Sequence, residues 1–302
     1  MVFRLIFDRV LRSSVVMSLL AIFLGLLFPQ ASYIFKGYVN HSLIIMLAIS
    51  TMGMSLRSIF SAKRGVKWVL IGLALNYVVL STLCIFLGHA FFPEDVELKN
   101  GFVVMAAVPV AVAVVPFTYL TNGDAEYAMN ITTLLYILAL VLTPASIYLL
   151  FGSTINLWDL LMLDLQLILL PLAFSRILLL LKADTLPRWI YDIILNLALA
   201  VIVYAIIGVN QHTFFSQTSL LYPILAASLI RTFGIGILTE KVAYKVGVEK
   251  ALIPPLAMLA SIKNMALTST LALSLFTPKS SLPAAICMLL EIFFFIYLKT
   301  KA

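Results

Sequence analysis

The chain has 302 residues, of which 63% are hydrophobic and only 11% are charged. Soluble domains carry about 45–50% apolar and about 25% charged residues, so a soluble fold is excluded and lipid is the expected solvent for most of the surface. The net charge of +7 is spread over short gaps between apolar runs, which excludes the clustered basic patch of a nucleic-acid-binding protein.

The apolar runs are long enough to cross a membrane, since a span needs about 20 apolar residues. They predict an all-α membrane protein with ten transmembrane helices. In chain order the runs cover residues 11–29, 39–57, 67–91, 101–121, 125–151, 157–181, 189–210, 218–239, 252–276 and 281–298.

The lysines and arginines between these runs predict the orientation, because cytoplasmic loops carry an excess of them. Ten spans place both termini on one side. The gaps on that side hold fourteen cations, against three on the other side, so we expect both termini in the cytoplasm of a cell inner or plasma membrane. The fourteen are Arg4, Arg9, Arg12, Arg57, Lys63, Arg64, Lys67, Lys182, Arg188, Lys241, Lys245, Lys250, Lys299 and Lys301, and the three are Lys36, Lys99 and Lys279.

Ten helices divide into two halves of five, residues 1–151 and 152–302, and an odd-numbered repeat is inverted in its second copy. Inverted repeats with interrupted helices near the midplane are common in secondary transporters. The fourth run contains Pro109 and Pro116, and the ninth contains Ser261, Lys263 and Asn264. These stretches are about 150 residues apart, which favours a duplication.

Lys263 is the most informative residue of the sequence. A lysine at the bilayer centre costs about 2.5–3.5 kcal/mol on insertion scales, and Lys263 is about two to three turns from either end of its run, too deep to reach the interface. We expect it to face a protein-lined or wet cavity. Two compatible roles remain open: a functional charge in a transport path, or a buried ion pair, for instance with Glu291 in the last run.

The prolines of the fourth run predict a broken helix, because each removes a backbone donor; a simple kink is the alternative. The residues expected at this break, and therefore on the substrate path, are Pro109, Val112, Ala113, Val114, Val115 and Pro116. Backbone groups freed by such a break bind ions or substrate, and the N-termini of half-helices favour anions.

Other intramembrane polar residues need partners. Asp164 lies in the sixth run and Asn76 in the third. Arg176 and Arg231 are expected near the cytoplasmic interface in structural roles. The sequence has no nucleotide-binding glycine loop, no nucleophile elbow and no paired metal ligands, so it predicts no enzyme, no metal site and no cofactor.

Several stretches resemble the bile acid:sodium symporter family. They are Pro109 to Pro144 with Thr118-Tyr119-Leu120-Thr121-Asn122-Gly123-Asp124 and Leu142-Thr143-Pro144, Thr51-Met52-Gly53-Met54-Ser55-Leu56, Leu169-Leu170-Pro171, and Ser261-Ile262-Lys263-Asn264-Met265-Ala266-Leu267. The resemblance implies ten helices in two inverted repeats, arranged as a panel domain and a core domain, with the broken helices 4 and 9 crossing.

The same resemblance implies that the sodium sites of the family are lost. The positions that match the family's Ser-Asn pair, serine and threonine ligands are Val114, Val115, Ala128 and Thr132; its shared glutamate falls at Leu259, its helix 9 glutamine at Lys263 and its helix 3 glutamine near Asn76. Only the threonine survives, and a fixed ammonium in the site would repel a cation.

These observations predict a sodium-independent secondary transporter of a small organic anion in the lipid bilayer, in which Lys263 replaces the bound cation. Asn264 and the broken fourth helix are expected to line the path. Two rivals remain: a proton-coupled carrier in which Lys263 titrates, and a membrane binding or regulatory protein that kept the fold without transport.

Overall fold

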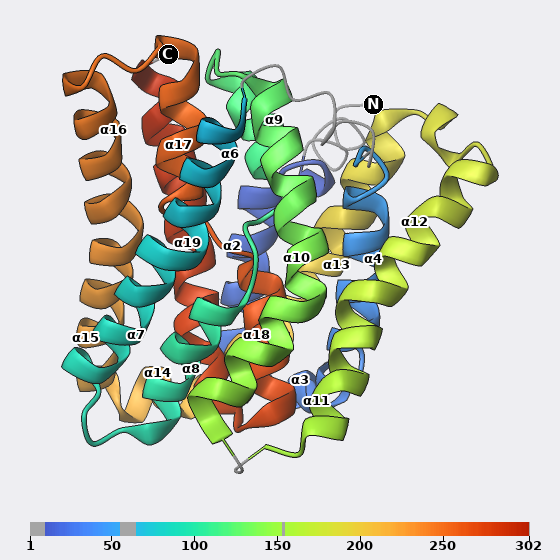
Figure 1. The fold of residues 1–302 in the computed structure, drawn as a ribbon. Coiled ribbons are helices and arrows are strands. Elements are labelled where there is room, and N and C mark those ends of the chain that lie inside the picture. The colour runs from blue at the N-terminus through green and yellow to red at the C-terminus, as the bar shows by residue number, and fades with distance from the viewer. Residues whose placement is uncertain (1–9, 55–64, 153–154, 302) are drawn as a thin grey trace.

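The computed structural model describes residues 10–54, 65–152 and 155–301, and all regular elements within these ranges are helices (Figure 1). The α-helices are α2 (Ser14–Leu27), α3 (Ser32–Lys36), α4 (Val39–Ser50), α6 (Val66–Leu73), α7 (Ser81–Phe91), α8 (Val96–Ala107), α9 (Val114–Leu120), α10 (Ala125–Phe151), α11 (Leu157–Asp164), α12 (Leu170–Leu180), α13 (Arg188–Val209), α14 (Gln211–Ser216), α15 (Thr218–Leu229), α16 (Ile235–Lys245), α17 (Ile253–Leu259), α18 (Met265–Leu275) and α19 (Pro278–Lys301).

Six helices in the described ranges are long and apolar enough to cross a membrane, or seven if a pair bent by 98°, Ser14–Leu27 with Pro29–Lys36, counts as one. The six are Val66–Phe91, Ala125–Phe151, Trp158–Leu180, Arg188–Val209, Thr218–Lys245 and Pro278–Lys301. The other three predicted runs contain a shorter helix, α4, or the interrupted pairs α8/α9 and α17/α18. The all-α membrane class is confirmed, whereas the count of ten spans and their inverted repeat stay predictions.

Three of the long helices contain a π-helical segment, and each segment holds or adjoins a buried polar residue. The segments are Ala74–Leu80, Leu165–Leu169 and Ile230–Gly234, and the polar residues are Asn76, Asp164 and Arg231. A π-bulge changes the direction in which the following side chains point, and it is frequent at functional sites. These local distortions therefore mark where polar side chains enter the apolar bundle.

The end of α8 follows from the proline at position 109. The residue before a proline is pushed out of the helical region, and Val108 is extended with φ −84° and ψ 155°. In the second interrupted pair a side chain sets where the helix begins again. The Asn264 side chain accepts a hydrogen bond from the Leu267 N–H at 3.0 Å and caps the N-terminus of α18. Both predicted interruptions are thus present, one imposed by proline and one by a polar cap.

Of the two interrupted pairs, α8, α17 and α18 are mostly buried, whereas α9 is partly exposed. α8 packs against α7, α18 and α19, while α13 packs against α2 and α4 (Figure 1). A Cβ atom at Gly101 would overlap the backbone oxygen of Ser280, so the close approach of α8 and α19 depends on this glycine. This packing holds the end of α8 against the start of α18.

Some predicted features lie outside the described residues. They are the orientation-setting cations Arg4, Arg9, Arg57, Lys63 and Arg64, and the last two residues of one family-like stretch, Ser55 and Leu56.

Candidate functional site

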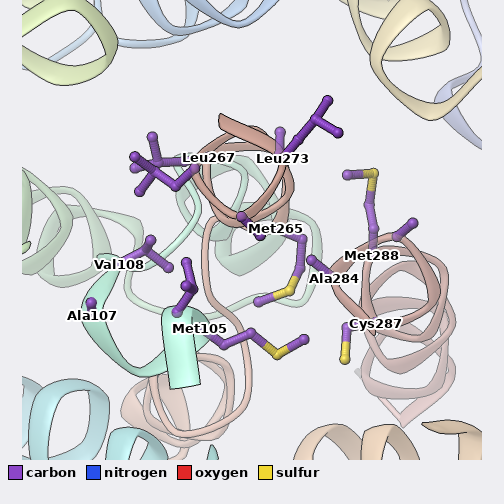
Figure 2. Close-up of a cluster of buried hydrophobic side chains, with 14 of the residues drawn as sticks. Met105, Ala107, Val108, Met265, Leu267, Leu273, Ala284, Cys287 and Met288 are labelled. Atoms are coloured by element: carbon purple, nitrogen blue, oxygen red, sulfur yellow. The ribbon is translucent and has the colours of Figure 1, made fainter. Parts of the chain in front are cut away.

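The two helix interruptions touch each other. The backbone N–H of Asn264 donates to the carbonyl of Pro109 at 2.8 Å, which joins residues 155 positions apart in the chain. Figure 2 shows a cluster of buried apolar side chains from the end of α8, from α18 and from α19, including Met105, Met265 and Met288. This contact between the interruptions is here called the crossover, and residues next to it, Val108 and Met265, belong to the buried apolar cluster.

The ammonium group of Lys263 lies in a cage of three oxygen atoms. It donates to the Ser81 hydroxyl at 2.9 Å, to the Ala106 carbonyl at 3.0 Å and to the Val108 carbonyl at 2.8 Å. The residue is completely buried, with 0% of its surface exposed. An ammonium has three protons, so each of them has an acceptor.

Two of these acceptors belong to the C-terminal end of α8. The last carbonyls of a helix lack intrahelical partners and carry the negative end of the helix dipole. A cation is therefore stabilised there, and Lys263 supplies one from the other interruption. The ammonium also lies 4.9 Å from the centre of the Tyr77 ring, a favourable cation–π position.

Glu291 is not the counter-ion of the Lys263 ammonium, which corrects one of the two expected roles. Its Oε1 atom accepts the backbone N–H of Lys263 at 3.1 Å and lies 2.7 Å from Nη2 of Arg231. Arg231 is completely buried, so its side chain does not reach out of the protein as expected for an arginine near the cytoplasmic interface. Position along an apolar run does not reveal that a partner on another helix stabilises a buried arginine.

Asn264 and Ser261 make internal contacts. The Asn264 amide donates to the Tyr136 hydroxyl at 2.7 Å and so ties the crossover to α10. The Ser261 hydroxyl donates to the Ala257 carbonyl at 2.7 Å, within its own segment. Both residues therefore lie at the crossover, and Asn264 is the one that joins it to another helix.

Asn76 caps the second interruption. Its amide nitrogen donates to the carbonyls of Leu259 at 3.0 Å and Ile262 at 3.3 Å, at the end of α17. Its Oδ1 atom is buried without a hydrogen-bond partner among the described residues, as is the hydroxyl of Thr132. Thr132 is the threonine expected to survive among the sodium-ligand positions, and Asn76 lies near the match to the helix 3 glutamine.

The first interruption supplies backbone to the site. Pro109 and Val114 are buried, Val112, Ala113 and Val115 are partly buried, and Pro116 is exposed. Pro116 is thus the exposed residue of this stretch, and the placement of these residues on the substrate path stays a prediction. Val114, Ala128 and Leu259 are each 0% exposed and present only carbon.

The sequence analysis missed three side chains of the site. Ser81 is a ligand of the ammonium, Tyr77 lies under it, and Tyr136 accepts from Asn264. Ser81 also donates to the Ala106 carbonyl at 2.6 Å. The sequence feature that could have identified these three residues is a hydroxyl group within a long apolar run. Hydroxyl groups are common in membrane helices, however, so this feature alone does not distinguish a site.

A family model decides which class of protein this architecture belongs to. The model described as "Sodium Bile acid symporter family" matches residues 41–232, more than half of the chain. The chain belongs to the sodium bile acid symporter family. It is therefore a membrane transporter of the bile acid symporter type, in a family of transporters and not of enzymes.

The matched residues cover only part of the crossover. They include the first interruption, Asn76 and Arg231, whereas Lys263 and Glu291 lie beyond residue 232. No match was found among curated proteins. The role of Lys263 therefore rests on the geometry of the crossover.

Proposed function

We propose that the protein is a sodium-independent secondary transporter of a small organic anion, in which Lys263 occupies the place of a bound cation. The three-oxygen cage around its ammonium carries this proposal. Two backbone carbonyls and a hydroxyl are hard oxygen donors of the kind that bind small cations. A tethered ammonium supplies the positive charge without uptake of sodium from solution.

Two further observations support sodium independence. The side chains at Val114, Ala128 and Leu259, where the resemblance places sodium ligands, have no oxygen and are fully buried. A unit positive charge held nearby by Lys263 also repels a second cation, and the repulsion is strong where water is excluded.

The proposed architecture is two inverted repeats, residues 1–151 and 152–302, forming ten spans in a panel and a core domain with cytoplasmic termini. Two paired features support it. The interruptions follow Ala107 and Leu259, and the π-helical segments begin at Ala74 and Ile230, so both pairs are separated by about half the chain. Rocking of one domain against the other would provide alternating access.

The substrate is expected to be an anion because the crossover holds a fixed positive charge. The Lys263 protons are all used by protein oxygens, so the lysine attracts the anion through its field and does not need to bind it directly. Asn264, Ser261 and the backbone of the first interruption are the proposed groups along the path. The organic anion itself remains to be found by screening.

The same oxygen cage argues against the alternative function, a proton-coupled carrier in which Lys263 titrates. Three acceptors stabilise the charged ammonium, and loss of its proton would leave the lone pair of a neutral amine facing oxygen atoms. A non-transporting protein of the same fold would show no flux, so transport measurements separate that class from both carriers.

Flux in vesicles tests the proposal. Purified protein in phosphatidylethanolamine–phosphatidylglycerol vesicles is offered labelled cholate, lactate and succinate, with sodium, potassium or choline as the external cation. We expect at least one anion to enter at the same rate in all three salts. Uptake that vanishes in choline would contradict sodium independence, and absence of any flux would contradict transport.

The same assay tests Lys263. Loss of one side of a buried charge interaction costs several kcal/mol, so Lys263→Gln is expected to reduce uptake about tenfold or more. Lys241→Gln, at an exposed lysine of α16, is the matched control and should transport normally. Lys263→Arg keeps the charge and cannot release a proton, so any remaining uptake by this variant excludes titration of Lys263.

A further inference from the structure

Asp164 is a buried acidic residue that the crossover does not use. It is the last residue of α11, next to the π-helical segment Leu165–Leu169, in the candidate span Trp158–Leu180. At 1.5 Å per residue it lies about 9 Å along the helix from Trp158. Its exposed fraction is 5%, and its Oδ1 atom is buried without a hydrogen-bond partner among the described residues.

No basic side chain in the described ranges forms an ion pair with Asp164. Arg231 is paired with Glu291, and the ammonium of Lys263 has its three acceptors. Arg176, one helix turn or more beyond the π-helical segment, donates to the carbonyls of Thr51 and Met54 at the end of α4. These three cations are thus bound to other groups.

The elements packed against this part of the span are α4, α10 and α12. Their titratable and charged residues are His41 on α4, Glu126, Tyr127, Tyr136 and Tyr148 on α10, and Arg176 on α12, with Asp159 on α11 itself. No cation among them offsets a negative charge on Asp164.

α10 connects the segment around Asp164 to the crossover. α11 and the π-helical segment Leu165–Leu169 pack against α10, and Tyr136 of α10 accepts the hydrogen bond from the Asn264 amide. When an organic anion enters, the fixed charge of Lys263 is neutralised by the substrate. Asp164 has no ion-pair partner among the described residues, so its ionised form would add a negative charge that no described cation offsets, which is strongly unfavourable in an apolar region.

We propose that Asp164 is the proton-binding site through which this transporter couples passage of the anion to passage of a proton. A proton from hydronium bonds to a carboxylate oxygen of Asp164 and forms the neutral acid, with water as the other product; on the opposite side the same O–H bond breaks. One anion and one proton then cross together without net charge. This inference rests on the proposed anion transport and assigns its coupling ion.

Infrared difference spectroscopy tests proton binding without any substrate. The protein in lipid nanodiscs is titrated through the acidic to neutral range, and the carbonyl band of protonated carboxylic acids is followed. We expect a titrating band that Asp164→Asn removes and that Asp159→Asn, at an exposed aspartate of the same helix, retains. A spectrum unchanged by Asp164→Asn would overturn the proposal. Asp164→Glu keeps a carboxyl group and checks folding, since its band should persist.

Flux tests the coupling. Cholate accumulation in vesicles is measured with the interior one pH unit more alkaline than the medium. One proton per anion gives about tenfold accumulation at equilibrium, since one pH unit corresponds to a factor of ten. Asp164→Asn should equilibrate without accumulation, while Asp159→Asn accumulates like the wild type. Uptake that ignores the pH difference would overturn the coupling. If no anion enters, anion transport fails, and the infrared titration still decides whether Asp164 binds a proton.

Discussion

The two helix interruptions meet at one point, but they are built in opposite ways. Residues 108–113 have only apolar side chains, and this stretch contributes backbone carbonyls. Residues 260–264 contain a serine, a lysine and an asparagine, and contribute side chains. The ends of the preceding helices differ accordingly: α8 is capped by the ammonium of Lys263, and α17 by the neutral amide of Asn76.

This difference shows how a positive charge can be installed at one interruption only. The positive charge at the end of α8 must come from the second interruption, because residues 108–113 of the first interruption have only apolar side chains. The backbone of Lys263 is in turn anchored by Glu291, which is held by Arg231. The charged cap therefore depends on a second buried ion pair, whereas the neutral cap needs only Asn76.

The largest effect is expected from removing the charge of Glu291. Breaking a buried ion pair from one side costs about 3–5 kcal/mol, so Glu291→Gln should lower the unfolding temperature strongly by leaving Arg231 unpaired. Glu240→Gln is the control, because Glu240 pairs with the partly exposed Lys301 and such pairs contribute about 1 kcal/mol or less. The double change Arg231→Met with Glu291→Met should recover much of the loss; equal destabilisation by both single glutamine variants would contradict the anchoring role.

A smaller effect is expected from removing the charged cap. Lys263→Met has similar volume and leaves the Val108 carbonyl and the Ser81 hydroxyl without their donor, while Ala106 keeps its bond from Ser81. Each buried unsatisfied group costs about 1–3 kcal/mol, so roughly 2–5 kcal/mol should be lost in detergent unfolding. Lys241→Met, at an exposed site, should unfold like the wild type. A Lys263→Met protein as stable as wild type would mean that the oxygen cage is not stabilised by the ammonium.

The smallest effect is expected at the neutral cap. Asn76→Leu removes the donor to Leu259 and Ile262 but also removes the unpartnered Oδ1 atom, so the two changes partly offset each other. We expect a loss of about 1–2 kcal/mol, below that of Lys263→Met. The comparison of the two variants in one unfolding series tests whether the charged cap is the stronger. An Asn76→Leu protein that is the less stable of the two would reverse the proposed difference between the interruptions.

The sequence by itself determined that lipid surrounds most of the fold, the family, and the burial of Lys263. Apolar runs of about 20 residues admit no soluble structure, and the resemblance to the symporter family is confirmed by the matched residues 41–232. The prolines of the fourth run and the Ser-Lys-Asn stretch of the ninth marked both interruptions correctly. These features are local, so composition and backbone chemistry suffice to predict them.

Only the tertiary structure decided the partners. Lys263 finds its acceptors on α7 and at the end of α8, and Glu291 pairs with Arg231 in a π-helical segment. The pairing expected between Lys263 and Glu291 exists only through a backbone N–H. Hydropathy predicts how deep a side chain lies along its helix, but the direction in which it points depends on helix rotation, on π-segments and on packing against residues more than a hundred positions away. These three factors together place Lys263 in its oxygen cage and leave Asp164 without an ion-pair partner among the described residues.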